Sequence, residues 1–254
     1  MDHKVCVVTG SSSGIGAAVA RLFAGRGWRV VVNYSRDAAP AQTVAAQCRE
    51  LGAEVLVQQA DVSQDADCRR LAAAVAAQWE RCDLLVNNAG TTKFVGLRDL
   101  EGLDAADFQR IHAVNVVGAF QMVRALAPLL QRSAPAAVVN MSSGAGSSGG
   151  GSSIAYATSK GALNTLTVAL ARALAPGVRV NAVAPGLVET PWLQQGLGPE
   201  RFAASVAKYK SRAALAEVMQ PDDVARAVWY LGVEALKTTG EVLAVDAGAR
   251  LLPG

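Results

Sequence analysis

Short apolar runs alternate with helix-like segments along almost the whole chain, and this alternation limits the folds open to it. The runs expected as strands lie at residues 5–9, 29–34, 54–60, 84–87, 136–142, 179–184 and 241–246. The segments expected as helices lie at 17–24, 38–51, 65–80, 104–131 and 156–175. Apolar strands separated by helices are typical of a parallel sheet covered on both faces. The sequence therefore predicts an α/β fold with a doubly wound parallel sheet of about seven strands.

The length of 254 residues suits one large α/β domain or two small ones. No internal repeat or linker-like segment divides the chain, so we expect a single domain over residues 1–254. A hydrophobic fraction of 51% and a charged fraction of 18% provide for a sizeable core and argue against disorder. Residues 185–199 form the most irregular segment. They follow a strand's C-terminal end, where such sheets bind ligands.

Composition also excludes several classes of partner. A net charge of +3 is too small to indicate nucleic acid. We expect no membrane partner, because no uninterrupted apolar stretch approaches spanning length, and the first residues lack a signal-peptide pattern. The cysteines Cys6, Cys48, Cys68 and Cys82 lack metal-type spacing. We expect no metal site, reduced and mostly buried thiols, and a cytoplasmic location.

A glycine- and serine-rich segment, residues 9–16, directly follows the first expected strand. Its glycines stand at Gly10, Gly14 and Gly16, a spacing that differs from GxGxxG. Such a turn lets the backbone approach a pyrophosphate, and the following helix offers free N–H groups and a positive dipole end. The pattern alone is also compatible with a plain flexible turn. Its position after the first strand favours phosphate binding.

Tyr156 and Lys160 stand four residues apart in an expected helix and so share one of its faces. An ammonium near the phenol would favour the ionised form of the phenol and lower its pKa. Ser143 lies 13 residues before Tyr156, at the end of an apolar run. Alone, the tyrosine or the lysine would more often be a surface residue of a helix.

Together these segments resemble the short-chain dehydrogenase/reductase family, in its single-domain branch, and the 3-ketoacyl-(acyl carrier protein) reductases within it. The resemblance covers essentially the whole chain. The segments that carry it are the TGxxxGxG-like residues 9–16, the NNAG at 87–90, the NVVG at 115–118, Ser143 with Tyr156-x-x-x-Lys160, and Pro185-Gly186 with Thr190. It implies a Rossmann-type fold and hydride transfer between a nicotinamide cofactor and a ketone or secondary alcohol.

The resemblance implies a catalytic set of four residues. Tyr156 would be the general acid or base, and Lys160 would lower its pKa and bind the nicotinamide ribose. Ser143 would hold the substrate oxygen, with Ser142 as a less favoured alternative. Asn115 would bend its helix and hold a water that links Lys160 to bulk solvent.

The resemblance also implies a cofactor-binding set. Its members are Gly10, Ser12, Ser13, Gly14, Ile15, Gly16, Asn33, Tyr34, Ser35, Arg36, Asp61, Val62, Asn88, Ala89, Gly90, Tyr156, Lys160, Pro185, Gly186, Val188 and Thr190. Residues 29–34 end without an acid, and the following Ser35 and Arg36 can bind a 2′-phosphate, so we expect NADP(H) rather than NAD(H). Against this, Ser13 stands where many NADP-preferring members carry a basic residue. The alternative for Arg36 is a solvated loop charge. Asp37 lies past the usual ribose position, and we expect it to be a loop or helix-cap residue.

The substrate is a small carbonyl compound or alcohol that the sequence does not identify. Ketoacyl thioesters, sugars, steroids, pteridines and xenobiotic ketones all suit the resemblance. Expected pocket walls lie at 91–95, 145–153 and 186–212, with Trp192 and Leu193 either as an apolar lid or as ordinary helix packing. By the same resemblance we expect a homotetramer, or a dimer, formed by the helices of Asn115 and Tyr156 with residues 239–252. The alternative functions are a non-redox dehydratase or epimerase and a catalytically idle nucleotide-binding sensor.

Overall fold

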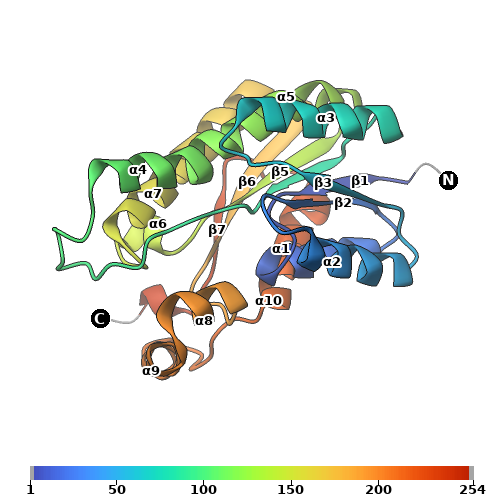
Figure 1. The fold of residues 1–254 in the computed structure, drawn as a ribbon. Helices are drawn as coiled ribbons and strands as arrows, with labels where there is room; N and C mark the ends of the chain where they lie inside the picture. The colour runs from blue at the N-terminus through green and yellow to red at the C-terminus, as the bar shows by residue number, and fades with distance from the viewer. Residues whose placement is uncertain (1–2, 252–254) are drawn as a thin grey trace.

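A computed structural model describes residues 3–251, and one seven-stranded parallel sheet forms its centre (Figure 1). The strands are β1 (Val5–Val8), β2 (Arg29–Tyr34), β3 (Val55–Gln59), β4 (Leu84–Asn87), β5 (Ala136–Met141), β6 (Val178–Pro185) and β7 (Val242–Val245). Their order in the sheet is β3-β2-β1-β4-β5-β6-β7, and every pairing is parallel. This confirms the predicted fold class.

Helices cover both faces of the sheet. They are α1 (Gly14–Ala24), α2 (Ala38–Glu50), α3 (Asp65–Trp79), α4 (Ala105–His112), η1 (Ala113–Gly118), α5 (Ala119–Arg132), α6 (Ala145–Ser148), α7 (Ile154–Leu174), α8 (Pro191–Leu197), α9 (Pro199–Lys210), α10 (Pro221–Trp229), η2 (Tyr230–Glu234) and η3 (Ala249–Leu251). One core cluster joins the sheet to α1, α2 and α10, and the other joins it to α3, α5 and α7. Figure 1 shows these two layers, with α8 and α9 standing apart from them.

The central strands are buried on both faces because each face is covered. Along β1, Val5 and Val7 belong to one core cluster, while Cys6 and Val8 belong to the other. This alternation follows from the two-residue period of a strand. Val8 pairs with Val86 of β4, so both strands end at the same edge of the sheet. The chain order reverses between β1 and β4, which is where ligands bind in doubly wound sheets.

The expected helix at 104–131 is continuous but changes its winding. Residues 113–118 form the π-helical segment η1 between α4 and α5. The change of winding falls at Asn115, where a local bend of the helix was expected. A π segment of this kind is often found at functional sites.

The expectation of an irregular segment at 185–199 was wrong for its second half. Helix α8 begins at Pro191, after Thr190 accepts a hydrogen bond from the Leu193 amide, and α9 begins at Pro199. A proline in the first turn is a helix-start signal. Two short helices separated by Gly198 lack the long apolar period by which helices are recognised in a sequence.

One helical stretch, Ala105–Arg132, is long and apolar enough by composition to cross a membrane, with a mean hydropathy of 1.5. Arg110, Asn115, Gln121 and Arg124 interrupt this stretch, so it is not an uninterrupted apolar run. Half of its most apolar part is buried within the fold, where Met122, Leu126 and Leu130 join the core. A core helix passes the same test of length and composition. The four cysteines are free and buried, as expected.

Candidate active site

A cavity of about 1050 Å³ lies at the carboxyl edge of the sheet, and most of the predicted site residues line it. Those that do are Gly10, Ser13, Gly14, Ile15, Asn33, Ser35, Arg36, Asp61, Val62, Asn88, Ala89, Gly90, Ser143, Tyr156, Lys160, Pro185, Gly186, Val188 and Thr190. The cavity lining does not include Ser12, Gly16, Tyr34 or Asn115. The structure thus brings together segments that lie up to 180 residues apart, from Gly10 to Thr190.

The loop between β1 and α1 follows a path that needs glycine at two positions. Gly10 and Gly14 have φ angles of 59° and 55°, in the left-handed region where a side chain is unfavourable. Ser13 precedes the first turn of α1, and its side chain makes no capping hydrogen bond. The first amides of α1 therefore face the cavity edge as donors suited to an anionic group.

The Asn33 side chain connects this loop to β2 and β3 by hydrogen bonds. Its Oδ1 accepts from the Gly10 amide at 2.9 Å, and its Nδ2 donates to the carbonyl oxygens of Tyr34, Gln58 and Ala60 at 3.1–3.2 Å. These bonds engage both ends of the Asn33 amide. The role of this side chain is to hold the glycine loop in place.

Four hydrogen bonds join the glycine loop to the NNAG segment. Asn88 Nδ2 donates to the carbonyl oxygens of Thr9 and Gly10, both at 3.0 Å, and Thr9 Oγ1 accepts from the amides of Asn88 and Ala89, both at 3.0 Å. A Cβ at Gly16 would lie 2.5 Å from Asn88 Nδ2 and 2.6 Å from the Gly10 oxygen. Gly16 is therefore a packing residue that lets α1 approach these two segments.

The end of β2 presents a positive charge to the cavity. Arg36 is exposed, lines the cavity wall, and forms no hydrogen bond or ion pair with any of residues 3–251. Asp37 accepts a hydrogen bond from the Ala39 amide at 3.0 Å and caps α2, which confirms its predicted cap role. The first carboxylate after β2 in the sequence, that of Asp37, is thus hydrogen-bonded to the first turn of α2.

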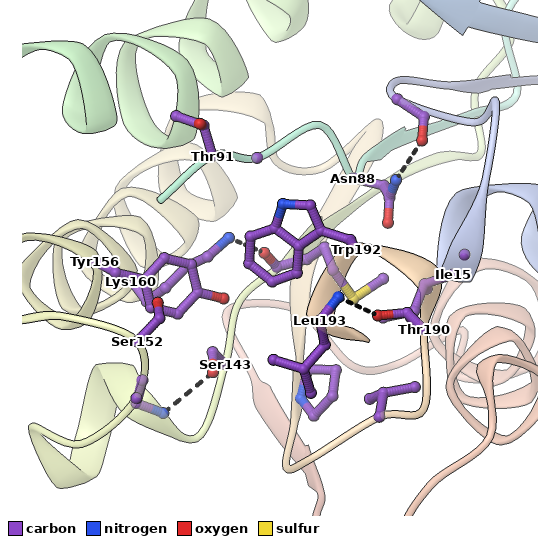
Figure 2. A pocket seen from close by; sticks show the side chains of 18 of the residues that line it. Ile15, Asn88, Thr91, Ser143, Ser152, Tyr156, Lys160, Thr190, Trp192 and Leu193 are labelled. Carbon is purple, nitrogen blue, oxygen red and sulfur yellow. Dashed lines mark hydrogen bonds between the residues drawn. The ribbon is translucent and has the colours of Figure 1, made fainter. Parts of the chain in front are cut away.

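Tyr156 and Lys160 lie side by side in the first turns of α7, with Ser143 below them (Figure 2). Ser153 Oγ starts this helix by accepting from the Tyr156 amide at 3.2 Å. Lys160 Nζ lies 5.5 Å from the centre of the Tyr156 ring and donates to the Met141 carbonyl oxygen at 2.7 Å. Ser143 Oγ accepts a hydrogen bond from the Ala145 amide at 3.2 Å, and the side chain lies close enough to the Tyr156 phenol to lower its pKa.

The neighbouring Ser142 points elsewhere. Its hydroxyl bonds to Asn164 Oδ1 and, at 3.4 Å, to the Lys160 carbonyl oxygen, and both partners belong to α7. Ser143, in contrast, influences the Tyr156 phenol and acts to lower its pKa. This favours Ser143 over Ser142 as the substrate-facing serine.

Burial governs the ionisation of both groups. It raises the pKa of the Tyr156 phenol above its ordinary value, while the nearby Ser143 side chain opposes this. Burial also lowers the pKa of Lys160 to about 8. The expected lowering of the Tyr156 pKa is thus reversed in this structure, because desolvation is the larger effect.

Asn115 lies behind the cavity wall and connects three elements. Its Oδ1 accepts from the Thr91 amide at 2.8 Å, and its Nδ2 donates to the Thr91 carbonyl oxygen at 3.0 Å and to Ser159 Oγ at 2.9 Å. The side chain is 1% exposed. It fastens the segment after the NNAG to η1 and α7.

The cavity also has aromatic walls whose pairing the sequence did not reveal. The ring centre of Trp192 lies 5.6 Å from that of Phe94 and 6.4 Å from that of Tyr156. Phe94 and Trp192 are 98 residues apart, and no local pattern links them. Tyr209, whose hydroxyl donates to the Asp246 carbonyl oxygen at 2.7 Å, was likewise not singled out.

Comparison with known proteins gives concordant matches. The family model described as "Enoyl-(Acyl carrier protein) reductase" matches residues 10–250. The chain is 45% identical over 251 residues to a protein assigned as ketoacyl reductase 2 of the granaticin polyketide synthase from Streptomyces violaceoruber, covering 99% of this chain and 98% of that protein. It is 32% identical over 251 residues to the 3-oxoacyl-[acyl-carrier-protein] reductase of Synechocystis, covering 98% and 97%.

A solved structure is also closely similar. A crystal structure assigned to a short-chain dehydrogenase/reductase from Burkholderia xenovorans superposes with a TM-score of 0.92. The two sequences are 44% identical, and the match covers 99% of each chain.

Proposed function

The chain belongs to the short-chain dehydrogenase/reductase family of oxidoreductases, and on this premise we propose that it interconverts a ketone and a secondary alcohol with NADP(H). The observation that carries the proposal is the cluster of Tyr156, Ser143 and Lys160 at the cavity wall. Relatives named as ketoacyl reductases make keto compounds the first substrates to test. We regard residues 1–254 as one catalytic domain, since strands from β1 to β7 form a single sheet.

Family membership implies an NAD(P) cofactor, and the residues present fit one. The glycine loop and the first amides of α1 suit the pyrophosphate, and the Tyr156 end of the cavity suits the nicotinamide. When bound, the nicotinamide supplies a hydride to the carbonyl carbon or accepts one from the carbinol carbon. Ser35 and the unpaired Arg36 suit a 2′-phosphate, because guanidinium and hydroxyl groups donate to phosphate oxygens.

In the direction of reduction, Ser143 donates a hydrogen bond to the ketone oxygen, where negative charge develops. Tyr156 then gives its hydroxyl proton to that oxygen as hydride reaches the carbon, so the C=O bond becomes C–O–H. A raised pKa suits this role, since the phenol remains protonated at neutral pH until the more basic oxygen forms. In oxidation Tyr156 takes the proton back.

Lys160 and Asn115 have positioning and electrostatic roles in this scheme. Lys160 uses one N–H on the Met141 oxygen, which leaves two for a ribose hydroxyl and for stabilising the Tyr156 phenolate. Asn115 holds Thr91 and so keeps the adjacent Gly90 beside Lys160, where an added Cβ would lie 3.8 Å from Lys160 Nζ.

The reaction is tested with NADPH and a panel of ketones, followed at the nicotinamide absorbance. Tyr156→Phe should lower turnover by about 10²- to 10⁴-fold, the usual contribution of a general acid. Tyr230→Phe is the matched control, because Tyr230 is 47% exposed and lies outside the cavity lining. Wild-type turnover by Tyr156→Phe would refute the mechanism. Cofactor that copurifies and does not exchange during turnover would point instead to a non-redox reaction.

The cofactor preference has a separate test. Arg36→Ala should weaken NADPH binding by about 1–3 kcal/mol, or roughly 5- to 150-fold, and leave NADH binding nearly unchanged. Arg49→Ala is the control, because Arg49 is also exposed but lies at the far end of α2. Equal losses for both cofactors, or equal kcat/KM values for them in the wild type, would contradict the assignment.

We extend the proposal to assembly and location. Val117, Phe120 and Val168 expose 48%, 40% and 38% of their surfaces on the helices expected to form a tetramer or dimer. Leu251, in the C-terminal segment, is 68% exposed, while Leu252 lies outside the described residues. Light scattering after size-exclusion chromatography would test this, with a monomer as the contradicting result. The four free buried thiols support the cytoplasmic location.

A further inference from the structure

The ring centre of Trp192, on helix α8, lies 6.4 Å from that of Tyr156 and 5.6 Å from that of Phe94. We propose that this aromatic pair makes the site selective for ketones fused to a flat ring system, which stack on Trp192 as their oxygen reaches Ser143 and Tyr156. The inference rests on the proposed function and narrows its substrate class.

The geometry places Trp192 where a substrate must meet it. Its ring centre lies 6.4 Å from that of Tyr156, within the 4.5–7 Å range of aromatic pairs. The residue lines the cavity while keeping 42% of its surface exposed. Figure 2 shows the indole ring beside Tyr156 and Lys160, with Thr190 and Leu193 on its other side. A ketone that reaches the phenol therefore contacts the indole face.

Phe94 is held as a fixed support for this ring. The next residue, Val95, donates its amide proton to the Ser152 carbonyl oxygen at 2.9 Å, and the hydroxyls of Thr92 and Ser152 are 2.7 Å apart. A Cβ at Gly196 would overlap the Phe94 ring, so this ring packs directly against α8. Phe94 thus sets the position of Trp192 through their contact of 5.6 Å.

Another part of the cavity lining consists of small residues. They are Ser143, Gly144, Ala145, Ser148, Gly151 and Ser152. A Cβ at Gly151 would lie 2.9 Å from Ala145 Cβ and 3.4 Å from Tyr156 Cδ1, so this part of the lining lies close against the tyrosine ring. The small side chains of this part of the lining leave room for a flat group beside the tyrosine ring.

This part of the cavity also suits a neutral ligand. Arg110, the cation of the lining nearest the segment of Thr91, is paired with Asp107 at 3.2 Å. Helix α8 has no buried residue, and it ends at Gly198, whose φ of 77° needs glycine. Stacking on an indole face stabilises a bound flat ring more than a saturated ring of the same size.

The test compares 2-tetralone with 2-decalone, which share a carbon skeleton but differ in the flatness of the second ring. In the wild type kcat/KM should be higher for 2-tetralone. Trp192→Ala should lower that value by about two- to tenfold and change the value for 2-decalone less than twofold. Trp192→Phe should restore most of the loss, and Phe94→Ala should act in the same direction. Leu215→Ala is the control, since Leu215 is 71% exposed and outside the cavity lining.

Binding separates this inference from the proposed reaction. The dissociation constant of 2-naphthol, a flat alcohol, is measured by calorimetry in the presence of NADPH and in its absence. It should rise at least twofold in Trp192→Ala and remain near the wild-type value in Trp192→Phe and Leu215→Ala. Unchanged binding in Trp192→Ala, or equal kinetic losses for both ketones, would overturn the inference. Failure to reduce any ketone, with naphthol binding as expected, would refute only the proposed reaction.

Discussion

Removal of the Asn115 side chain tests whether this residue is mainly a structural clamp. Asn115→Ala deletes three hydrogen bonds of 2.8–3.0 Å at a position that is 1% exposed. At about 0.5–1.5 kcal/mol each, and with the Thr91 amide and carbonyl left without a partner, the unfolding free energy should fall by about 3 kcal/mol. For a chain of this size that corresponds to a Tm lower by about 6–12 °C.

The assay is thermal unfolding followed by circular dichroism, together with a double-mutant cycle. Ser159→Ala removes one of the three bonds, so Asn115→Ala/Ser159→Ala should be less destabilised than the sum of the single variants by about 1 kcal/mol. Gln131→Ala, which removes an exposed amide from α5, is the control and should change stability by less than about 0.5 kcal/mol. If Tm stayed within about 2 °C of the wild type while turnover was lost, the clamp would be refuted in favour of a purely catalytic role.

Three further outcomes follow from other buried groups. Because burial lowers the pKa of Lys160 to about 8, the unfolded chain binds more protons than the folded chain between pH 8 and 10.5, and the unfolding free energy should rise with pH in that window. Denaturation at pH 8 and 9.5 should show this rise in the wild type and not in Lys160→Met. The same pH dependence in both proteins would contradict it. Gly186→Ala would place a Cβ against the Tyr209 hydroxyl and should lower the unfolding free energy by about 1–3 kcal/mol. Adding Tyr209→Phe should restore part of this loss. Equal Tm values for Gly186→Ala and Gly186→Ala/Tyr209→Phe would argue against the contact. Asp83→Asn weakens the buried ion pair with Arg81, whose N–O contacts are 2.8–2.9 Å. The unfolding free energy should fall by about 2 kcal/mol at pH 7. An unchanged urea midpoint would show that the pair contributes little to stability.

The features that the sequence determined by itself are those that depend on neighbours along the chain. Apolar runs mark the strands because a strand covered on both faces needs apolar side chains throughout, and the alternation with helices then requires a parallel sheet. Tyr156 and Lys160 share a face because of helix geometry alone, and Asp37 caps α2 through the amide two residues ahead. The position of the glycine loop after β1 is local in the same sense.

The roles that only the tertiary structure decided belong to groups whose partners are distant in sequence. Asn33 and Gly16, both expected at the cofactor, hold the glycine loop against residues from β3 and the NNAG segment. The pKa of Tyr156 follows from burial, and burial is the product of every element around the site. The contact of Phe94 with Trp192 depends on where α8 stands relative to a loop almost 100 residues earlier. Local patterns specify which chemistry the chain carries, whereas solvent exclusion and long-range contacts specify how each group behaves and which substrates fit.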